Sequence, residues 1–371
     1  MKIKSHLLAL SLVTAGLSFT AYANAKESFD LNALIAAAQR EEAITIYAPT
    51  GKIVQQAKDF SEKYGVKAVG IKAKSPQIIE IISREAQAGN VKTDVALIED
   101  APATQVQLLD KGYVTSWVPE DMQQDIVKEY QNPLTVVLAP NVWSYNTDQY
   151  DSCPITNIWQ LTEPKWRNKI AMQDPLIKPL YADTFNQMAT NYDDQMAKAY
   201  QEHYGEPLKT DEASATAEFV KRLAQNGPLL TKSDGDAAQA IGAPDAKESF
   251  VGLISTAKFR DNKNGMKLGI CRDMKPFIGA LYPAPGVITT KTNSPNASKL
   301  FIHYLMTAEG IKLQGVDGKM SSNQKVALPT EEASGIQQYR NQLMMYKTAT
   351  STSDWQKRQD WMDLWSLNYQ R

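Results

Sequence analysis

Apolar and polar positions along the chain alternate between the spacing of helices and the spacing of strands. Asp30 can cap a first helix, whose apolar residues recur at helical spacing as far as Ala38. A short β-rich run at 43–48 and a second amphipathic segment at 53–60 come next. The alternation continues with predicted strands at 66–71 and 94–98 and with predicted helices beginning at 75 and 101.

The pattern changes in the middle of the chain. Residues 134–139 and 142–145 read as strands, and residues 151–167 then read as a loop-rich connection containing two prolines and two tryptophans. The following strands and helices form a second set of alternating elements. Strands that alternate with helices predict parallel pairing and doubly wound α/β sheets. Strands are expected at 170–172, 250–254, 266–270 and 279–288, and helices at 182–190, 195–204, 211–225 and 296–307.

The end of the chain carries an aromatic stripe. Residues 348–353 are small and polar, which predicts an exposed loop before a terminal helix. In that helix Trp355, Met362, Trp365 and Tyr369 fall near one face. Aromatic residues at helical spacing usually pack in a core, so the helix is expected to lie against the body of the protein.

The first residues have the order of an export signal. Lys2 and Lys4 precede a short apolar run at 7–19, and the segment from Ala23 to Ala25 supplies small residues for a peptidase. The run is shorter than the ~20 apolar residues of a membrane span. We therefore expect cleavage after Ala25 and a soluble protein in the periplasm.

Charge and cysteine content narrow the range of partners and compartments. The chain has 40 basic and 41 acidic residues, so it offers no basic field for a nucleic acid. Its two cysteines, Cys153 and Cys271, would be exported to an oxidising compartment, which favours a disulfide bond over two free thiols.

Several motifs in a fixed order resemble those of a known family. They are ITIYAPTGK, TDVAL, VWSYNT, LTEPKW, KIAMQDP, YPAPGVI and ASKLFIHYLMTAEG. This order resembles the extracellular solute-binding proteins of ABC importers, in the branch typified by bacterial ferric-ion-binding proteins. The resemblance implies an α/β fold of the type II periplasmic-binding class, in which two doubly wound lobes joined by crossing strands enclose a cleft. It also implies a monomer that delivers a small solute to a membrane permease.

On this basis the chain is divided into five parts. The first is the signal peptide at 1–25, and the first lobe begins with 26–145. The second lobe occupies 146–283, the chain returns to the first lobe at 284–322, and C-terminal helices at 323–371 pack on the lobes.

The chain departs from the iron-binding pattern of the family it resembles. That branch holds ferric ion with two adjacent tyrosines after a strand of the second lobe, often with a histidine and a glutamate from the first. Here Ala257 and Lys258 occupy the places of the tyrosine pair, and the first-lobe loop at 48–52 has neither histidine nor glutamate. We therefore expect no metal site and no resident cofactor.

Groups suited to an anion occur where predicted strands give way to helices. Thr50, Gly51 and Lys52 stand at one such junction, and Ser75 stands at another. Backbone N–H groups and the dipole at a helix N-terminus attract anions, and hydroxyl groups add donors. Each of these residues has an alternative role as a turn or helix-cap residue.

Carboxylates, hydroxyls and one lysine form the remainder of the predicted site. Carboxylates suit the hydroxyls of a polyol. The alternative role of Asp183 is to cap its helix, and that of Tyr181 is to pack in the core. These predicted contacts are Asp100, Asp174, Tyr181, Asp183, Thr184, Ser255, Thr256 and Lys258.

The combination favours a solute receptor over an enzyme. The chain has none of the sequence signatures GxSxG, HExxH or GxxxxGK[ST], and the adjacent carboxylates Glu99-Asp100 and Asp193-Asp194 are of a kind that is commonly solvated. The expected solute is a phosphorylated sugar or another organic phosphate or phosphonate. The alternatives are a ferric-ion or iron-complex binding protein, an exported enzyme acting on a small anion, and a sensor that presents its solute to a membrane receptor.

Overall fold

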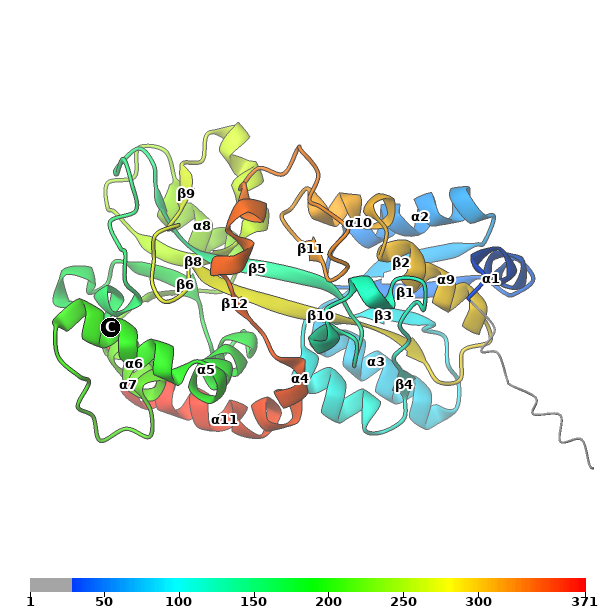
Figure 1. Ribbon diagram of the computed structural model, residues 1–371, viewed down its shortest axis with the longest axis horizontal. Helices are drawn as coiled ribbons and strands as arrows, with labels where there is room; N and C mark the ends of the chain where they lie inside the picture. The colour runs from blue at the N-terminus through cyan, green and yellow to red at the C-terminus, as the bar shows by residue number, and fades with distance from the viewer. Residues whose placement is uncertain (1–28) are drawn as a thin grey trace, which may run out of the picture.

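The computed structural model describes residues 29–371, so the predicted signal peptide at 1–25 lies outside the described residues. Within the described part, no helix is both long and apolar enough to cross a bilayer. Figure 1 shows strands and helices gathered into two lobes at either end of an elongated molecule, with long strands running between them.

Two long antiparallel strands connect the lobes. They are β5 (Thr135–Asn146) and β10 (Gly279–Thr289), and their side chains are almost all buried. They occupy the centre of a sheet with the strand order β2-β1-β3-β10-β5-β8-β6-β7. A Cβ on Gly279 would lie 2.0 Å from the Asn141 carbonyl oxygen, so the close approach of the two strands requires glycine there.

The first lobe is built around parallel strands. β1 pairs in parallel with both β2 and β3, and helices cover the two faces, as the alternating pattern predicts. Its strands are β1 (Ile44–Ala48), β2 (Ala68–Lys72), β3 (Val95–Leu97) and β4 (Val114–Thr115). Its helices are α1 (Leu31–Ala38), α2 (Lys52–Tyr64), α3 (Ser75–Ala88), α4 (Ala101–Thr104), α9 (Pro295–Leu305) and α10 (Ala308–Gly315).

The second lobe repeats this plan. β6 pairs in parallel with β7 on one side and with β8 on the other, while β9 pairs with the end of β5. The strands are β6 (Ile170–Gln173), β7 (Leu229–Thr231), β8 (Val251–Ser255) and β9 (Leu268–Ile270). The helices are α5 (Leu180–Asn191), α6 (Asp193–Tyr204), α7 (Ala215–Gln225) and α8 (Asp234–Gly242), followed by the 3-10 helix η6 (Thr256–Asn264).

Three sequence expectations differ from the structure. The helix expected from residue 101 is the short α4, which continues as the π-helix η1 (Gln105–Leu109). The two strands expected at 134–145 form the single strand β5. The expectation of an exposed loop at 348–353 is wrong, because the 3-10 turn η8 (Thr348–Thr350) leads directly into α11 (Ser351–Asn368). Thr348 and Ser351 are buried there.

The terminal helix α11 packs on the body of the protein as its aromatic stripe predicts. Trp365 is buried and stacks on Phe185 of α5, and Tyr369 just beyond the helix stacks on Trp365. In Figure 1 α11 runs along the lower edge from the second lobe to α4 of the first. Two short strands, β11 (Met320–Ser321) and β12 (Met344–Met345), lie between α10 and α11 in the chain.

The expected disulfide between Cys153 and Cys271 is confirmed. The two Cα atoms lie 5.0 Å apart, and the bond joins positions separated by 118 residues within the second lobe. Cys271 is fully buried. The bond therefore closes a long loop in the second lobe. It lowers the conformational entropy that the unfolded chain would have without it.

Removing this disulfide is expected to lower stability. Replacing both cysteines with alanine should reduce the free energy of unfolding by ~2–5 kcal/mol, because the unfolded chain regains loop entropy. Denaturant unfolding of the double variant measures the change. Ser152→Ala, at an exposed neighbouring position, is the control and should leave the transition unchanged. Coincident unfolding curves for the parent and the double variant would contradict the prediction.

Candidate functional site

A cleft of about 660 Å³ lies between the lobes and is lined by residues of both. It opens where the strands of each lobe end and helices begin, which is the position at which α/β sheets bind ligands. The first lobe contributes Pro49, Thr50, Gly51, Lys52, Lys72, Glu99, Asp317 and Lys319. The second contributes Lys178, Leu180, Asp234, Ser255, Ala257, Lys258 and Arg260, and the crossing strands contribute Ala139, Asn141 and Tyr282.

The lining is strongly basic although the whole chain is not. Its charged side chains are six cations and three carboxylates, which leaves an excess of three positive charges in the cleft, whereas the net charge of the chain is −1. A concentration of one sign of charge in a cleft favours ligands of the opposite sign. The cations are Lys52, Lys72, Lys178, Lys258, Arg260 and Lys319, and the carboxylates are Glu99, Asp234 and Asp317.

Each carboxylate of the cleft is matched by one cation. Lys319 bonds Glu99, Arg260 Nη1 lies 2.8 Å from Asp317 Oδ1, and Lys258 Nζ lies 3.9 Å from Asp234 Oδ2. Within residues 29–371, the other three cations form no ion pair. The unmatched cations are Lys52, Lys72 and Lys178.

Lys178 is the most distinctive of the unmatched cations. It lies in the turn between β6 and α5, where its ammonium donates a hydrogen bond to Gln173 Oε1 at 2.9 Å and lies 5.4 Å from the centre of the Tyr181 ring. Burial lowers the pKa of Lys178 below its usual value, and the nearby Asp234 and Glu99 only partly oppose that shift. A desolvated ammonium without a carboxylate partner is stabilised when an anion lies beside it.

The N-terminus of α2 adds a second source of positive potential. Its N-cap is Gly51, which has no side chain to cap the first turn, and Lys52 is the first residue of the helix. The Thr50 hydroxyl accepts from the Lys52 N–H at 3.3 Å. Because both Gly51 and Lys52 line the cleft, the positive end of the helix dipole meets the cleft at this point.

Acceptors lie beside these donors. Asn141 lines the cleft and is 3% exposed. Its buried Oδ1 has no hydrogen-bond partner among the described residues. The Asp234 carboxylate, at the start of α8, accepts from the Ser255 N–H at 3.2 Å. Burial raises the pKa of Asp234, and Lys178 and Lys258 oppose that shift. The cleft therefore presents acceptors for hydroxyl or N–H groups next to cations.

The structure brings only some of the sequence-predicted residues into the cleft. Thr50, Gly51, Lys52, Ser255 and Lys258 all line it.

Four other predicted residues lie outside the lining of the cleft. The Ser75 hydroxyl accepts from the Glu99 N–H at 3.1 Å, the Thr256 hydroxyl donates to the Asp317 carbonyl oxygen at 3.1 Å, and Asp174 accepts from the Leu176 N–H at 2.9 Å. Tyr181 is 1% exposed.

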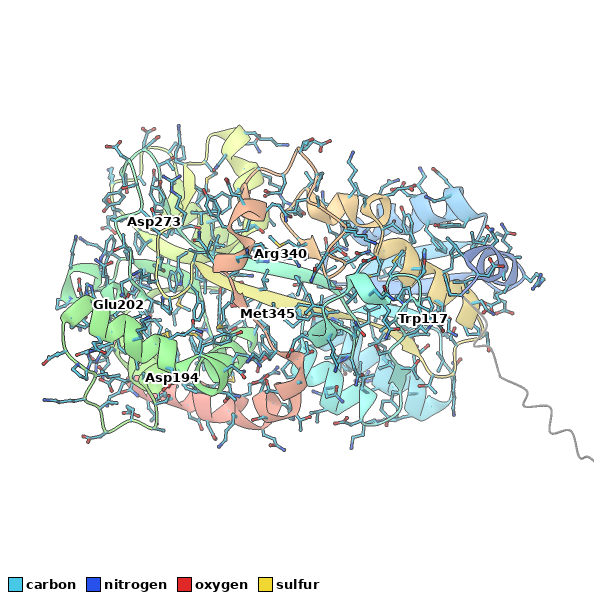
Figure 2. The ribbon with its side chains drawn as sticks, viewed as in Figure 1. Trp117, Asp194, Glu202, Asp273, Arg340 and Met345 are labelled. Atoms are coloured by element: carbon cyan, nitrogen blue, oxygen red, sulfur yellow. A yellow bond between two sulfur atoms is a disulfide. The ribbon has the colours of Figure 1, made fainter. Side chains whose placement is uncertain are left out.

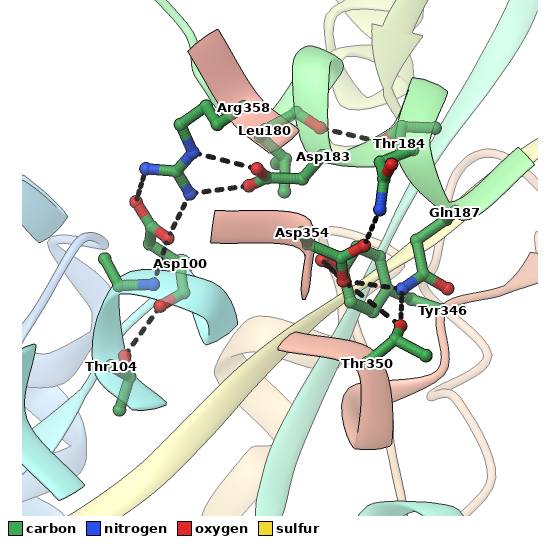
Figure 3. Close-up of polar contacts among 12 residues, drawn as sticks. Asp100, Thr104, Leu180, Asp183, Thr184, Gln187, Tyr346, Thr350, Asp354 and Arg358 are labelled. Carbon is green, nitrogen blue, oxygen red and sulfur yellow. Dashed lines mark hydrogen bonds and ion pairs between the residues drawn. The ribbon is translucent and has the colours of Figure 1, made fainter. Parts of the chain in front are cut away.

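The last three predicted residues make contacts within the protein. Thr184 donates to the Leu180 carbonyl oxygen at 2.7 Å. Asp100 and Asp183 both bind Arg358 of α11 (Figure 3). These side chains are occupied in the structure, so the cleft offers other groups to a ligand.

Sequence reasoning missed most of the charged lining. Lys72 ends β2 and Glu99 follows β3, so the strand-end rule applied to Thr50 could also have found them. Asp234 follows Ser233, the N-cap of the unpredicted helix α8. Lys178 lies in an aperiodic turn, and the chain gives no local signal for it. Arg260, Asp317 and Lys319 are brought to the cleft by tertiary packing alone.

Other acidic residues lie away from the cleft. Figure 2 places Asp194 and Glu202 on α6, on the outer side of the second lobe. The adjacent Asp193 accepts from the Ala215 and Thr216 N–H groups at the start of α7. The pair Asp193-Asp194 is therefore a structural feature of two neighbouring helices.

The two residues that follow η6's first position after β8 are not tyrosines, although Tyr282 of β10 also lines the cleft. Ala257 and Lys258 follow β8 and both line the cleft. Among residues 29–371, no group of three or more histidine, cysteine, aspartate or glutamate side chains is placed to hold a metal ion. His203 and His303 instead pair with Glu163 and Asp121 at 2.6 and 2.9 Å.

Comparisons with known proteins agree with this architecture. Residues 44–316 match the family model described as bacterial extracellular solute-binding protein. No curated protein matches the chain in sequence.

Solved structures resemble the chain over most of its length. A ferric binding protein from Campylobacter jejuni has a TM-score of 0.66 at 14% identity over 87% of this chain and 99% of its own. Iron-bound HitA from Pseudomonas aeruginosa has a TM-score of 0.63 at 13% identity over 86% and 99%. AfuA from Actinobacillus pleuropneumoniae, with exogenous fructose-6-phosphate bound, has a TM-score of 0.61 at 17% identity over 88% and 98%. These likenesses establish the two-lobed type II periplasmic-binding fold.

Proposed function

Because the chain belongs to the family of bacterial extracellular solute-binding proteins, whose members serve ABC importers, we propose that its inter-lobe cleft captures a small organic anion. The observation that carries this proposal is the excess of three positive charges in the lining, with Lys52, Lys72 and Lys178 lacking carboxylate partners among residues 29–371. Charge-assisted hydrogen bonds from such groups favour phosphate, phosphonate or carboxylate oxygens.

The hydrogen-bond acceptors of the cleft narrow the class of solute further. A bare inorganic anion offers few donors to the unpartnered Asn141 Oδ1 or to the Asp234 carboxylate. A phosphorylated sugar brings oxygens for the cations and hydroxyls for these acceptors. We therefore assign a phosphorylated sugar or a related hydroxylated organic phosphate as the solute. AfuA, which shares the fold, is described with fructose-6-phosphate bound.

The protein acts as a carrier in this proposal. The mature chain is a periplasmic monomer released from its signal peptide near Ala25, and the solute leaves it unchanged for a membrane permease. Both lobes contribute cations, so closure of the lobes is stabilised by a solute that contacts both.

Calorimetric titration of the mature protein tests this function. Hexose 6-phosphates are expected to bind with 1:1 stoichiometry and more tightly than inorganic phosphate or the parent hexose, because only the sugar phosphates satisfy both cations and acceptors. Binding should raise the melting temperature by mass action.

Two results would contradict the proposal. One is stoichiometric binding of ferric ion with a tyrosinate charge-transfer band, which would indicate an iron receptor. The other is steady release of inorganic phosphate from a bound hexose phosphate, which would indicate an enzyme.

A further inference from the structure

Arg358 of the terminal helix lies between two aspartates from opposite lobes (Figure 3). Its Nη2 is 2.7 Å from Asp100 Oδ1 and 2.7 Å from Asp183 Oδ2. Its Nε is 2.8 Å from Asp183 Oδ1, and its Nη1 is 3.4 Å from Asp100 Oδ2. One guanidinium therefore holds both carboxylates, each through two contacts.

The three residues come from three different elements. Asp100 is the N-cap of α4 in the first lobe, where it also accepts from the Ala103 N–H at 3.0 Å. Asp183 lies in α5 of the second lobe. The side chains of Arg358, Asp100 and Asp183 are only 12%, 12% and 0% exposed. Water therefore screens these contacts much less than it screens a surface ion pair.

The helix that carries Arg358 is fixed to the second lobe. Asp354, one turn earlier, accepts from Asn186 and Gln187 of α5 at 2.7 Å each, and Figure 3 shows Gln187 directed at this carboxylate. Together with the stacking of Trp365 on Phe185, these bonds attach both ends of α11 to α5. Arg358 thus moves with the second lobe.

The same helix also touches the first lobe. Trp355 packs against an apolar cluster of that lobe that includes Ile78 and Leu108. The Arg358 guanidinium lies 4.8 Å from the centre of the Trp355 ring, so it is positioned by the same contact. The helix therefore reaches the first lobe through an apolar contact and an ionic contact.

We propose that α11 is a third connection between the lobes, in which Arg358 and Asp100 form a latch that sets how far the cleft opens. β5 and β10 are continuous strands and can only bend, whereas the bond from Arg358 to Asp100 must break when the lobes separate. Arg358 is a positioning residue, since neither it nor Asp100 lines the cleft. The neighbouring Glu99 does line it.

We expect the latch to contribute more than a second ionic contact between the lobes. Arg260 of η6 pairs with Asp317, which follows α10; the Asp317 side chain is 7% exposed, but the Arg260 side chain is 42% exposed, against 12% for each partner of the latch. Water screens a pair with one exposed partner more than a pair in which both partners are nearly buried, and loss of one partner of a buried pair is strongly unfavourable. Breaking the Arg358–Asp100 contact should therefore dominate the change in lobe separation.

Asp100→Asn tests the latch with little risk to the fold. Asparagine is as good an N-cap as aspartate, so α4 is retained, and the bonds between Arg358 and Asp183 stay within the second lobe. The substitution therefore removes only the ionic contact between Arg358 and residue 100, which joins the two lobes. Lys357→Ala is the matched control, because Lys357 is the adjacent cation on α11 and its ion-pair partner within residues 29–371 is the exposed Asp360.

Distances between spin labels report the separation of the lobes without any solute. Cysteines for labelling can replace Lys58 on α2 and Lys198 on α6, whose side chains are 66% and 76% exposed. The described residues contain no free cysteine that would compete for the label. We expect the population of longer distances to rise about tenfold in Asp100→Asn, because a buried charge-assisted contact is lost from one conformation only.

The control and a second variant complete the test. Lys357→Ala should match the parent distribution, and Arg358→Lys should shift it in the same direction as Asp100→Asn, because lysine lacks the planar fork. Superimposable distributions for the parent, Asp100→Asn and Arg358→Lys would overturn the latch. Because no solute is present, the latch can fail or stand independently of the proposed function, which the calorimetric titration decides.

Discussion

Replacing Lys178 with methionine is expected to weaken binding of a hexose 6-phosphate by about a hundredfold, since a hydrogen bond to a charged group contributes ~1.5–3 kcal/mol. Burial lowers the pKa of Lys178, and among residues 29–371 its ammonium donates a hydrogen bond to the neutral Gln173 and forms no ion pair. Methionine retains the apolar stem against Tyr181 and removes the charge. Calorimetric titration of parent and variant measures the change.

Lys232→Met is the matched control for this substitution. Lys232 is exposed, precedes α8 and is not part of the cleft lining. Its replacement should leave the affinity unchanged, and equal losses in the two variants would show that Lys178 acts only through net charge. An unaltered affinity in Lys178→Met would remove Lys178 from the site.

The same lysine should give binding a pH dependence. Binding requires the charged ammonium, and the pKa of Lys178 in the free protein is lowered by burial. The contribution of Lys178 to affinity is therefore expected to be complete well below that lowered pKa and to be lost as the pH rises through it. An adjacent anion raises the pKa, so binding should take up protons in that range. The Lys178→Met variant should lose both effects, which titrations in buffers of different ionisation enthalpy can detect.

Arg358→Ala is expected to lower the free energy of unfolding by ~3–5 kcal/mol, because it leaves buried carboxylates without their counterion. Asp183 is fully buried and Asp100 nearly so. Chemical denaturation at neutral pH measures the loss. Lys357→Ala, which removes an exposed cation from the same helix, should change stability by less than ~1 kcal/mol.

The stability lost in Arg358→Ala should depend on pH in a defined direction. Burial raises the pKa of Asp183 to about 7 even though Arg358 opposes the shift. A carboxyl whose folded pKa is raised binds more protons in the folded state, so its contribution to stability falls as pH rises from about 4 to 7. Removing Arg358 removes the opposing charge, so the folded pKa of Asp183 should rise further and the dependence should extend to higher pH. The variant is thus expected to recover stability as the pH falls through this window.

A second substitution separates charge from packing. Asp183→Asn in the Arg358→Ala background removes one of the two unpaired charges and should restore part of the stability at neutral pH. If the double variant is no more stable than Arg358→Ala at any pH, the destabilisation reflects lost side-chain packing and the ionic account is wrong.

The regular elements of this fold follow from local patterns. The helix at 31–38 and the strands at 44–48 and 95–97 lie where apolar spacing and the capping Asp30 predict them. The terminal segment at 348–353 could not be read in this way. Its small polar residues indicate a loop, but burial of Thr348 and Ser351 and the bonds of Asp354 to α5 extend a helix through it.

The candidate site is harder to predict from the sequence than the fold, because tertiary packing determines which residues line it. A strand-to-helix junction in the sequence predicts Thr50, Gly51 and Lys52, and the structure places them in the cleft. Asp183 stands at a similar junction, yet Arg358, 175 positions later in the chain, occupies its carboxylate. Local pattern locates the loops that meet at the cleft, and distant partners decide which side chains remain available.

The most direct test of the account is a crystal structure of the mature protein grown with a hexose 6-phosphate. We predict one solute between the lobes, with phosphate oxygens within hydrogen-bond distance of Lys178 and a sugar hydroxyl donating to Asn141. Solute bound to one lobe only, or a ferric ion and no sugar phosphate in the cleft, would contradict it.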